Sequence, residues 1–476
     1  MLSSKSLCHH LLFLLVVCRA EILIQSQNFT YNSSFSLSAE QISAANLTEN
    51  EAHNFEIALN FERSNYAGGS VLEDPFYAVP DDFDPSNAPP PGSILKIEKV
   101  TDTSRYTIAP SLAMSRILYT SETLNGTSIP ASAYILWPYT PRSFPRLTSG
   151  GNGSTVFPVI GLAHGTSGQT PECAPSHIKA LWDDFHEPFA LGLNGYAIVA
   201  PDYAGLGVST VKSPYFVLPT QANDLIHAVQ AAQSAFPQLS REFVMLGQSQ
   251  GGAVAWSYAQ RQAQKPVPGY LGTVSISPFT DILGNIRADA QSQNNQRVAG
   301  IAQGLGSVLP SFKPSDWLTD AGIARRNLID EVGACGVAGA FLFLTQQQIL
   351  KDGWNSSSAS AWYSNISDNG NRPFAGPMLV LQGDMDANAN VNVTATSVDE
   401  TCAMFPDNSL EYKQYSGISH VPTLYASQYA WLDWIKDRFD GVKAKTGCSQ
   451  EILYPASGVA NGAGQKWIVE YDQYGI

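Results

Sequence analysis

The 476-residue sequence predicts an α/β fold with a mostly parallel sheet flanked by helices, and three observations lead to this prediction. Apolar runs alternate along the chain with amphipathic segments of helical period, as in βαβ units. The run Val156–Ala163 contains no polar residue, which is typical of a central parallel strand buried on both faces. The stretch Arg241–Gln260 passes from an apolar strand through a glycine-rich turn into an Ala-rich helix.

The other elements follow in chain order. A polar N-terminal region with a helical pattern near Ala39–Phe61 is either a propeptide or a segment lying over the core. Ser115–Thr120 and Ala133–Trp137 are interpreted as a strand pair around the Asn125-Gly126 turn. Further strands are expected at Gly195–Ala200, Phe243–Leu246, Leu271–Ile276, Met378–Leu381 and Glu411–Tyr415, and amphipathic helices at Thr220–Phe236 and Val421–Phe439.

The strand and helix alternation is interrupted once, and this defines the expected domains. Residues 278–371 are helical in pattern and separate two expected strands, so we interpret them as a cap inserted over the active site. Its apolar run Val332–Leu344 is either a buried cap helix or an acyl-binding wall. The expected division is a signal peptide at 1–20, a first core part at 21–277, the cap at 278–371, and a second core part with a C-terminal tail at 372–476.

Several features indicate secretion. Lys5, the apolar run Leu11–Val17 and a small-residue cleavage site at Cys18-Arg19-Ala20 are typical of a signal peptide, and the run is too short to span a bilayer. No other stretch qualifies as a transmembrane anchor, so we expect a released, extracellular protein. Eight N-x-S/T sequons agree with this: Asn28, Asn32, Asn46, Asn125, Asn152, Asn355, Asn365 and Asn392.

Charge and cysteine content limit the function classes. A net charge of −14 argues against nucleic acid and anionic membrane partners, and suits a neutral or cationic substrate. Four cysteines remain after the leader, and two disulfides are expected in an oxidising compartment; of three pairings we favour Cys173–Cys335 and Cys402–Cys448. No CxxC or histidine cluster predicts a metal, and no cofactor is expected.

A nucleophile is predicted at Ser249, in the G-x-S-x-G run 247–251. This pentapeptide also arises by chance, but here it joins a strand to a helix, as the nucleophile elbow of α/β-hydrolases does. The turn is so sharp that a Cβ two residues before or after the serine would collide with the strand or the helix. The strain holds the serine oxygen out at the edge of the sheet.

Chain order selects the partners of this serine. On this fold the nucleophile is followed by an acid and then by a histidine, and His420 is the only histidine after Ser249. Asp386 has the usual spacing after Gly383 and is our choice of acid, with Asp384 as the alternative. The backbone N–H groups of Thr166 and Gln250 are expected to form an oxyanion hole, because His164-Gly165 follows a central strand and Gln250 begins a helix. We expect the His164 side chain to be structural.

Seven segments carry a family resemblance: Asp74–Tyr77, Pro91–Leu95, His164–Thr166, Cys173–Ser176, Asp202–Gly207, Gly247–Gly252 and Ser419–Pro422. Together they resemble the fungal secretory lipase family within the α/β-hydrolases, over most of the mature chain. The resemblance implies a secreted serine lipase or carboxylesterase with a helical cap, and it supports Ser249, Asp386 and His420 as the triad. The family also includes esterases that deacetylate fungal secondary metabolites.

Ester hydrolysis through an acyl-enzyme is therefore the leading functional hypothesis, with a lipid or small-molecule ester as substrate. Deacetylation of a fungal metabolite is the alternative within the same chemistry. A serine peptidase or amidase would use the same triad but would need a site for a charged terminus, and no such constellation is evident. A non-catalytic binding protein on this fold is the third class, although such chains usually lose a triad member, and this one keeps all three.

Overall fold

The structure is a computed structural model and describes residues 34–147, 155–288 and 294–456. The expected signal peptide and three of the sequons, Asn28, Asn32 and Asn152, lie outside the described residues. All five described sequon asparagines are exposed, as glycosylation at the surface requires. Among the described residues, no helix is both long and apolar enough to cross a membrane.

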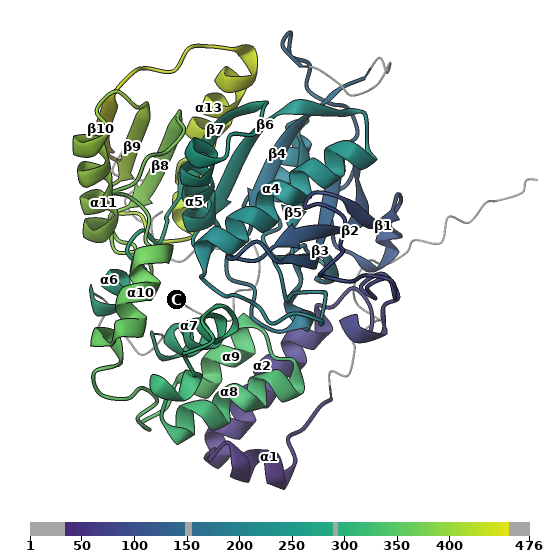
Figure 1. Ribbon diagram of the computed structural model, residues 1–476, viewed down its shortest axis with the longest axis vertical. Coiled ribbons are helices and arrows are strands. Elements are labelled where there is room, and N and C mark those ends of the chain that lie inside the picture. Colours follow the sequence, from purple (N-terminus) through teal and green to yellow (C-terminus); the bar gives the residue numbers. More distant parts are fainter. Residues whose placement is uncertain (1–33, 148–154, 289–293, 457–476) are drawn as a thin grey trace, which may run out of the picture.

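A ten-stranded sheet forms the centre of the molecule (Figure 1), with the strand order β1-β2-β3-β5-β4-β6-β7-β8-β9-β10. The strands from β5 to β10 in this order pair in parallel, and β1, β2 and β3 extend the sheet in antiparallel pairing. Their bounds are β1 Ile94–Glu98, β2 Leu112–Glu122, β3 Ser128–Pro138, β4 Phe157–Ala163, β5 Ala197–Pro201, β6 Leu239–Gln248, β7 Tyr270–Ile276, β8 Met378–Gly383, β9 Leu410–Tyr415 and β10 Cys448–Leu453.

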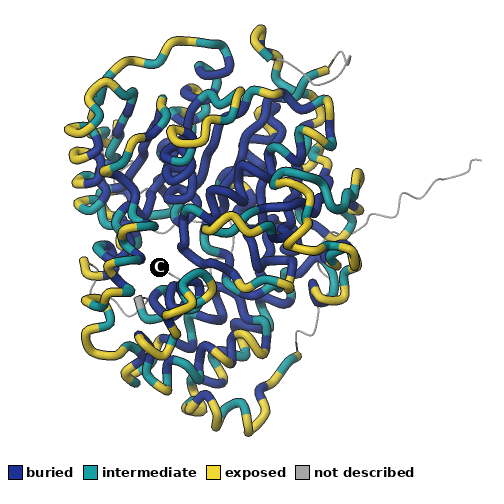
Figure 2. The backbone as a smooth tube through the Cα atoms, in the orientation of Figure 1, coloured by how far each residue is buried: buried dark blue, intermediate teal, exposed yellow. Residues whose placement is uncertain are grey.

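Helices cover both faces of the sheet, and alternate residues of each central strand meet them. Along β4, Val159 and Ala163 belong to the hydrophobic core on the side of α4 (Leu218–Ala235) and α5 (Gln250–Gln264). Ile160 and Leu162 belong to the core on the other side, with α3 (Pro188–Leu193) and α13 (Gln428–Asp440). This alternation explains the unbroken apolar run, because both faces of the strand are buried (Figure 2).

The segment between β7 and β8, residues 278–371, is called the inserted segment below. Its helices are α6 Ile282–Ala288, α7 Asn294–Val308, α8 Asp320–Val332, α9 Gly336–Phe343 and α10 Ser358–Ser367. In Figure 1, α7, α8 and α9 lie with the N-terminal helices α1 (Ala39–Ala44) and α2 (Glu49–Ser64) beyond the end of the strands. Thus α2 packs against α9, and the N-terminal region forms one helical layer with the inserted segment.

The remaining helices are short or peripheral. They are α11 Val391–Met404, α12 Pro422–Ala426 and the 3₁₀ turns η1 Val71–Glu73, η2 Thr103–Arg105, η3 Pro171–Cys173, η4 Pro175–His177, η5 Pro314–Asp316 and η6 Trp354–Ser356.

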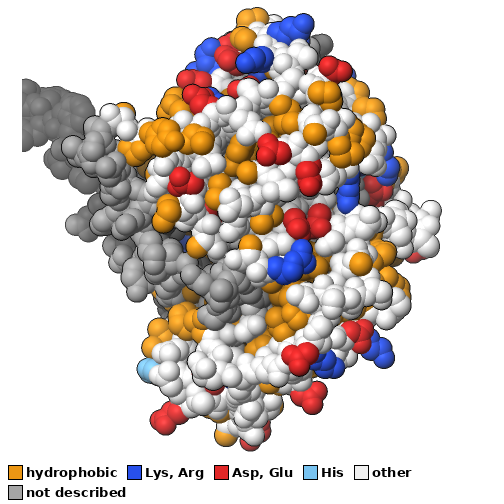
Figure 3. Space-filling view, turned by 90° about the vertical axis from the view of Figure 1, so that its left-hand side faces the viewer, with side chains coloured by type: hydrophobic (Ala, Val, Ile, Leu, Met, Phe, Trp, Pro, Cys, Tyr) orange, Lys and Arg blue, Asp and Glu red, His pale blue; other side chains and the backbone are white. Residues whose placement is uncertain are grey.

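On the face shown in Figure 3, acidic and basic side chains are interspersed with hydrophobic ones. The net negative charge of the chain is therefore not gathered into a single acidic patch on that face.

The structure differs from the sequence expectation at three elements. The helix expected over Val421–Phe439 is broken at Ser427 into α12 and α13. The apolar run Val332–Leu344 is not one helix, because Gly333 adopts a left-handed φ of 68° that ends α8 before α9 begins. The tail after Gly441, which its composition predicts to be rich in loops, contains an edge strand, β10, which pairs in parallel with β9.

Both disulfides join distant parts of the fold. Cys173 in η3 is bonded to Cys335, the residue that precedes α9, so the loop after β4 is tied to the inserted segment. Cys402 near the end of α11 is bonded to Cys448 at the start of β10, which fixes the last strand. These are the two pairings favoured from the sequence.

Candidate active site

Ser249 lies at the sharp turn between β6 and α5, with φ 59° and ψ −122°. A left-handed φ is strained for a residue with a side chain, and here two glycines make the turn possible. A Cβ on Gly251 would lie 1.8 Å from the carbonyl oxygen of Ala163, and one on Gly247 would lie 2.4 Å from the carbonyl oxygen of Gly251. The predicted elbow is therefore present, and its glycines are required by close backbone contacts.

The His420 ring is held by a buried carboxylate. His420 Nδ1 lies 2.7 Å from Asp386 Oδ2, and the Asp386 side chain is completely buried, while that of His420 is 12% exposed. Asp386 also accepts hydrogen bonds from the side chain of Gln382 (2.9 Å) and from the backbone N–H groups of Asn388 (2.9 Å) and Ala389 (2.8 Å). These donors replace the water that the buried carboxylate has lost.

The alternative acid, Asp384, makes different contacts. Its Oδ1 accepts a hydrogen bond from the backbone N–H of Gly417 (2.6 Å), and its own N–H donates to the carbonyl oxygen of Tyr415 (3.1 Å). Asp384 therefore connects the loop after β8 to the loop after β9. The structure pairs His420 with Asp386.

Three loops converge at the carboxyl end of β7. The backbone N–H of Ser249 donates to the carbonyl oxygen of Ile276, the last residue of β7, at 2.9 Å. The hydroxyl of the next residue, Ser277, donates to the carbonyl oxygen of His420 at 3.4 Å. Carboxyl ends of parallel strands meet at one edge of a sheet, and these two contacts bring the loops that carry Ser249 and His420 to the same end of β7.

The loop after β4 places Thr166 next to Gln250. The Thr166 hydroxyl donates to Gln250 Oε1 at 2.7 Å and lies 3.2 Å from the hydroxyl of Tyr215. Gln250 is the first residue of α5, so its backbone N–H has no acceptor within the helix. The two residues predicted to form an oxyanion hole are therefore neighbours at the positive end of a helix.

His164 is structural. Its ring is buried and stacked on Tyr203 with ring centroids 4.2 Å apart, and its nitrogens lie 2.6 Å and 3.3 Å from the carbonyl oxygens of Gly165 and Asp202. Burial lowers the pKa of His164 to about 4. A neutral ring at neutral pH donates one hydrogen bond and shapes the loop that carries Thr166.

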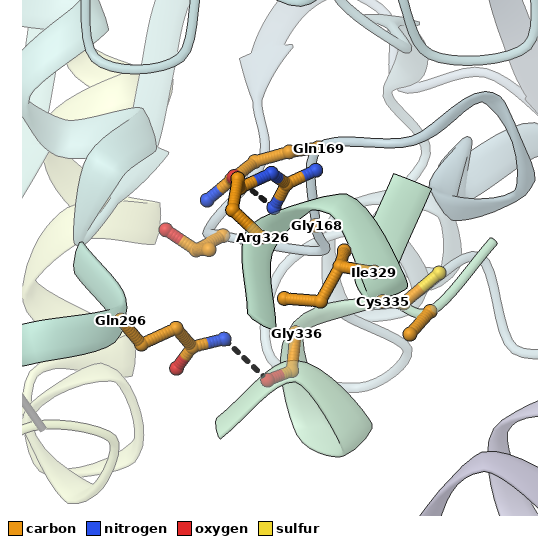
Figure 4. Close-up of a pocket in the computed structure, with 9 residues that line it drawn as sticks. Gly168, Gln169, Gln296, Arg326, Ile329, Cys335 and Gly336 are labelled. Atoms are coloured by element: carbon orange, nitrogen blue, oxygen red, sulfur yellow. Dashed lines mark hydrogen bonds between the residues drawn. The ribbon is translucent and has the colours of Figure 1, made fainter. Parts of the chain in front are cut away.

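The same loop packs directly against the inserted segment. A cavity of about 10 Å³, room for about one water molecule, lies between them (Figure 4). Arg326 donates to Gln169 Oε1 at 2.7 Å across it, and Gln296 Nε2 donates to the carbonyl oxygen of Gly336 at 2.8 Å. The cavity is lined by Thr166, Gly168, Gln169, Gln296, Arg326, Ile329, Ala334, Cys335 and Gly336.

Sequence reasoning missed two aromatic residues and one carboxylate at this site. Phe279 lies beside His420, with ring centroids 6.2 Å apart, and Tyr215 contacts Thr166. Asp183 Oδ2 accepts the backbone N–H of Gly165 at 3.3 Å, and burial raises the pKa of Asp183 to about 7. None of them falls in a recognisable motif, because the tertiary fold alone brings them to the site.

Within the described part of the chain, no cluster of histidine, cysteine, aspartate and glutamate side chains could hold a metal ion.

Fold and site geometry together define an α/β-hydrolase. Among solved structures, Candida antarctica lipase A in its closed state matches with a TM-score of 0.63 and 19% identity, covering 82% of this chain and 91% of that chain. A ligand-bound form of the rice cell wall degrading esterase LipA from Xanthomonas oryzae matches with a TM-score of 0.57 and 16% identity, covering 74% and 100%. At these identities the likeness establishes the fold.

The sequence comparisons establish the family. The profile described as "Secretory lipase" matches residues 189–447, and the chain belongs to that family of carboxylic ester hydrolases. Lipase 5 of Candida albicans is 25% identical over 323 residues, which are 61% of this chain and 68% of that protein. Lipase 4 of the same organism is 24% identical over 306 residues, 58% of this chain and 64% of that protein.

Proposed function

We propose that this protein is a secreted enzyme that cleaves carboxylic esters through a Ser249–His420–Asp386 triad. The observation that carries the proposal is the 2.7 Å contact between His420 and a fully buried Asp386, on the sheet edge where Ser249 sits in a strained elbow. An isolated buried carboxylate is costly, and this one is oriented by four donors including the histidine. The arrangement is that of an Asp–His pair serving a nucleophile.

The steps follow from the geometry. Ser249 Oγ attacks the ester carbonyl while His420 Nε2 accepts its proton, and Asp386 stabilises the imidazolium through Nδ1–H. The tetrahedral oxyanion is bound by the N–H groups of Thr166 and Gln250, each worth about 3 kcal/mol of the barrier. The imidazolium returns the proton to the departing alkoxide, which leaves as an alcohol. Water, activated by His420, then hydrolyses the acyl-enzyme.

Secretion belongs to the same proposal. Two disulfides and five exposed sequon asparagines suit an oxidising, glycosylating compartment, as the signal peptide expected at residues 1–20 requires. Residues 278–371 are proposed to act as a cap, because α9 is linked by Cys335 to the loop that carries Thr166. Within α9, Val337, Ala338, Leu342 and Phe343 are buried in the hydrophobic core, which favours a cap helix over an acyl-binding wall.

The test is hydrolysis of a 4-nitrophenyl ester series, from acetate to palmitate, by the secreted protein and by Ser249→Ala. We expect ester hydrolysis that falls at least about 10³-fold in the variant. The chain-length profile then separates a lipase, whose rate rises with length, from a deacetylase confined to acetate. A peptide p-nitroanilide measured in parallel addresses the peptidase alternative. Ester hydrolysis that Ser249→Ala leaves intact would refute the triad.

A further inference from the structure

Three polar side chains form a chain of hydrogen bonds beside the proposed oxyanion hole. The hydroxyl oxygens of Tyr215 and Thr166 lie 3.2 Å apart, and the Thr166 hydroxyl donates to Gln250 Oε1 at 2.7 Å. A threonine hydroxyl has one proton, and Gln250 Oε1 receives it, because an amide oxygen can only accept. Tyr215 is therefore the donor to Thr166, and the hydrogen bonds run in one direction from Tyr215 to Gln250.

Both ends of this chain are shielded from water. Tyr215 is 4% exposed and Gln250 is 2% exposed, whereas Thr166 between them is half-buried. A buried hydroxyl or amide that loses its partner cannot replace it with bulk water, so such bonds hold their side chains in one arrangement. The Thr166 side chain is thus fixed from two directions, by the proton that it receives and by the proton that it donates.

The backbone at Tyr215 is itself held in place. A Cβ on Gly304 of α7 would lie 2.6 Å from both the backbone nitrogen and the carbonyl oxygen of Tyr215, so this helix packs directly against it. The next residue, Phe216, has a left-handed φ of 56°, which is strained for an aromatic residue. Its carbonyl oxygen accepts a hydrogen bond from the hydroxyl of Tyr363 on α10 at 3.0 Å. Tyr215 is therefore a fixed point from which the hydroxyl of Thr166 can be oriented.

We propose that Tyr215 is a positioning residue of the oxyanion hole; the inference rests on the proposed ester hydrolysis. Its hydrogen bond orients Thr166, and Thr166 in turn is bonded to Gln250, so the two residues whose backbone N–H groups are proposed to bind the oxyanion are tied together. Such donors contribute most when they already point to the position that the oxyanion will occupy. Tyr215 acts through Thr166, so its effect should appear in the transition state and not in substrate binding.

The test measures kcat and KM separately for Tyr215→Phe, which keeps the ring and removes only the hydroxyl. On the 4-nitrophenyl ester that the wild type cleaves fastest, we expect kcat to fall about tenfold and KM to stay within about twofold. The second readout is the inhibition constant of an alkyl trifluoromethyl ketone. Ser249 adds to its carbonyl carbon and passes its proton to His420, which leaves the carbonyl oxygen as an oxyanion in the hole. This constant should rise about tenfold.

A double-mutant cycle and a control show whether the chain of hydrogen bonds acts as a unit. Thr166→Val removes the middle hydroxyl and keeps the backbone N–H, so adding Tyr215→Phe to it should lower kcat by less than about twofold. Tyr119→Phe is the matched control, because the buried Tyr119 hydroxyl donates to the carbonyl oxygen of Asp224 at 2.8 Å and has no bond to the proposed hole. It should lower the melting temperature by a similar amount and leave kcat and the inhibition constant unchanged.

Three results would overturn the inference. Tyr215→Phe leaves kcat and the inhibition constant unchanged, the losses in Tyr215→Phe and Thr166→Val are additive, or Tyr119→Phe lowers kcat as much. The last result would mean that the hydroxyl of Tyr215 only stabilises the fold. Failure of the proposed function itself is distinguishable, because the wild type would then show no ester hydrolysis that depends on Ser249, and the inference would fail with it.

Discussion

The edge of the sheet and the inserted segment are held in place by different contacts. At the edge, Ser249 and His420 are fixed by short loops that begin where parallel strands end, and Ile276 at the end of β7 and Ser277 directly after it contact both. The helices of the inserted segment are instead anchored by residues far away in sequence. Glu62 of α2 accepts the N–H groups of Cys335 (2.9 Å) and Ala338 (2.8 Å) at the start of α9.

This difference implies that the sheet edge governs the rate of catalysis and the inserted segment governs substrate preference. A sheet edge positions reacting groups within tenths of an ångström, because backbone ladders fix it from both sides. Helices attached by side chains, one disulfide and a short backbone bridge between Gly168 and Cys335 can differ between relatives without disturbing that edge. We therefore expect changes at the edge to abolish catalysis, and changes in the inserted segment to alter stability and substrate preference.

The largest effect is expected at Asp386, the proposed acid of the triad. Asp386→Asn should lower kcat/KM for a 4-nitrophenyl ester by about 10³ to 10⁴, since an amide cannot hold the required tautomer of His420 or stabilise its imidazolium. Asp384→Asn is the matched control, because Asp384 contacts Gly417 and Tyr415 and not the histidine. It should remain within about fivefold of the wild type. Equal losses in the two variants would contradict the assignment.

The elbow should tolerate no added atom. In Gly251→Ala the new Cβ would meet the carbonyl oxygen of Ala163 at 1.8 Å, and we expect a loss of about 3 kcal/mol or more in the free energy of unfolding. Gly68→Ala is the control, since its Cβ would find no atom nearer than 3.9 Å. Urea denaturation measures the free energy of unfolding of both variants. A Gly251→Ala protein as stable as the wild type would contradict the close contact between Gly251 and Ala163.

Loss of one disulfide should affect activity, whereas loss of the other should not. Removing either pair with alanine substitutions should destabilise the protein by about 2–4 kcal/mol. Only loss of Cys173–Cys335 should also slow catalysis, by about tenfold, because that bond joins the loop after β4 to α9. Thermal unfolding and ester kinetics on both double variants test this, and a similar kinetic defect without Cys402–Cys448 would be the contrary result.

The smallest effect concerns the anchor of α9. Burial raises the pKa of Glu62 from 4.5 to about 7, although the N–H groups that it accepts and Arg63 lower it. Between about pH 4.5 and 7, Glu62 keeps its proton in the folded protein but loses it in the unfolded chain. The contribution of Glu62 to the free energy of unfolding therefore falls as the pH rises through this window. The loss is about 1–3 kcal/mol.

Glu62→Gln removes this titration. The free energy of unfolding of the variant, measured in urea at pH 5, 6, 7 and 8, should fall less steeply than that of the wild type. Parallel curves for the two proteins would mean that Glu62 does not titrate in this range.

The sequence predicted the sheet edge better than the rest of the molecule. Ser249 and His420 could be proposed from the sequence alone, because a local glycine pattern and chain order single them out. The choice between Asp384 and Asp386 stayed open, since both follow Gly383 and only the loop geometry pairs one of them with the histidine. The break at Gly333 and the strand β10 were missed, because a left-handed turn and an added edge strand depend on tertiary contacts.

The contribution of the N-terminal region could not be predicted either. Glu62 and Arg63 lie in an ordinary amphipathic helix, and nothing local shows that they contact residues 332–338. Tyr215 and Phe279 come from separate segments of the chain and could not be predicted for the same reason. Local patterns predict the proposed reacting groups, whereas the positions of the groups around them depend on the complete fold.

The central claim, that Ser249 is the nucleophile activated by His420, is tested most directly by labelling with a fluorophosphonate and peptide mass spectrometry. We expect one adduct, on the peptide that contains Ser249, absent from Ser249→Ala and formed at least about 10³-fold more slowly in His420→Ala. An adduct on another serine, or an enzyme that cleaves esters while Ser249 stays unlabelled, would contradict it.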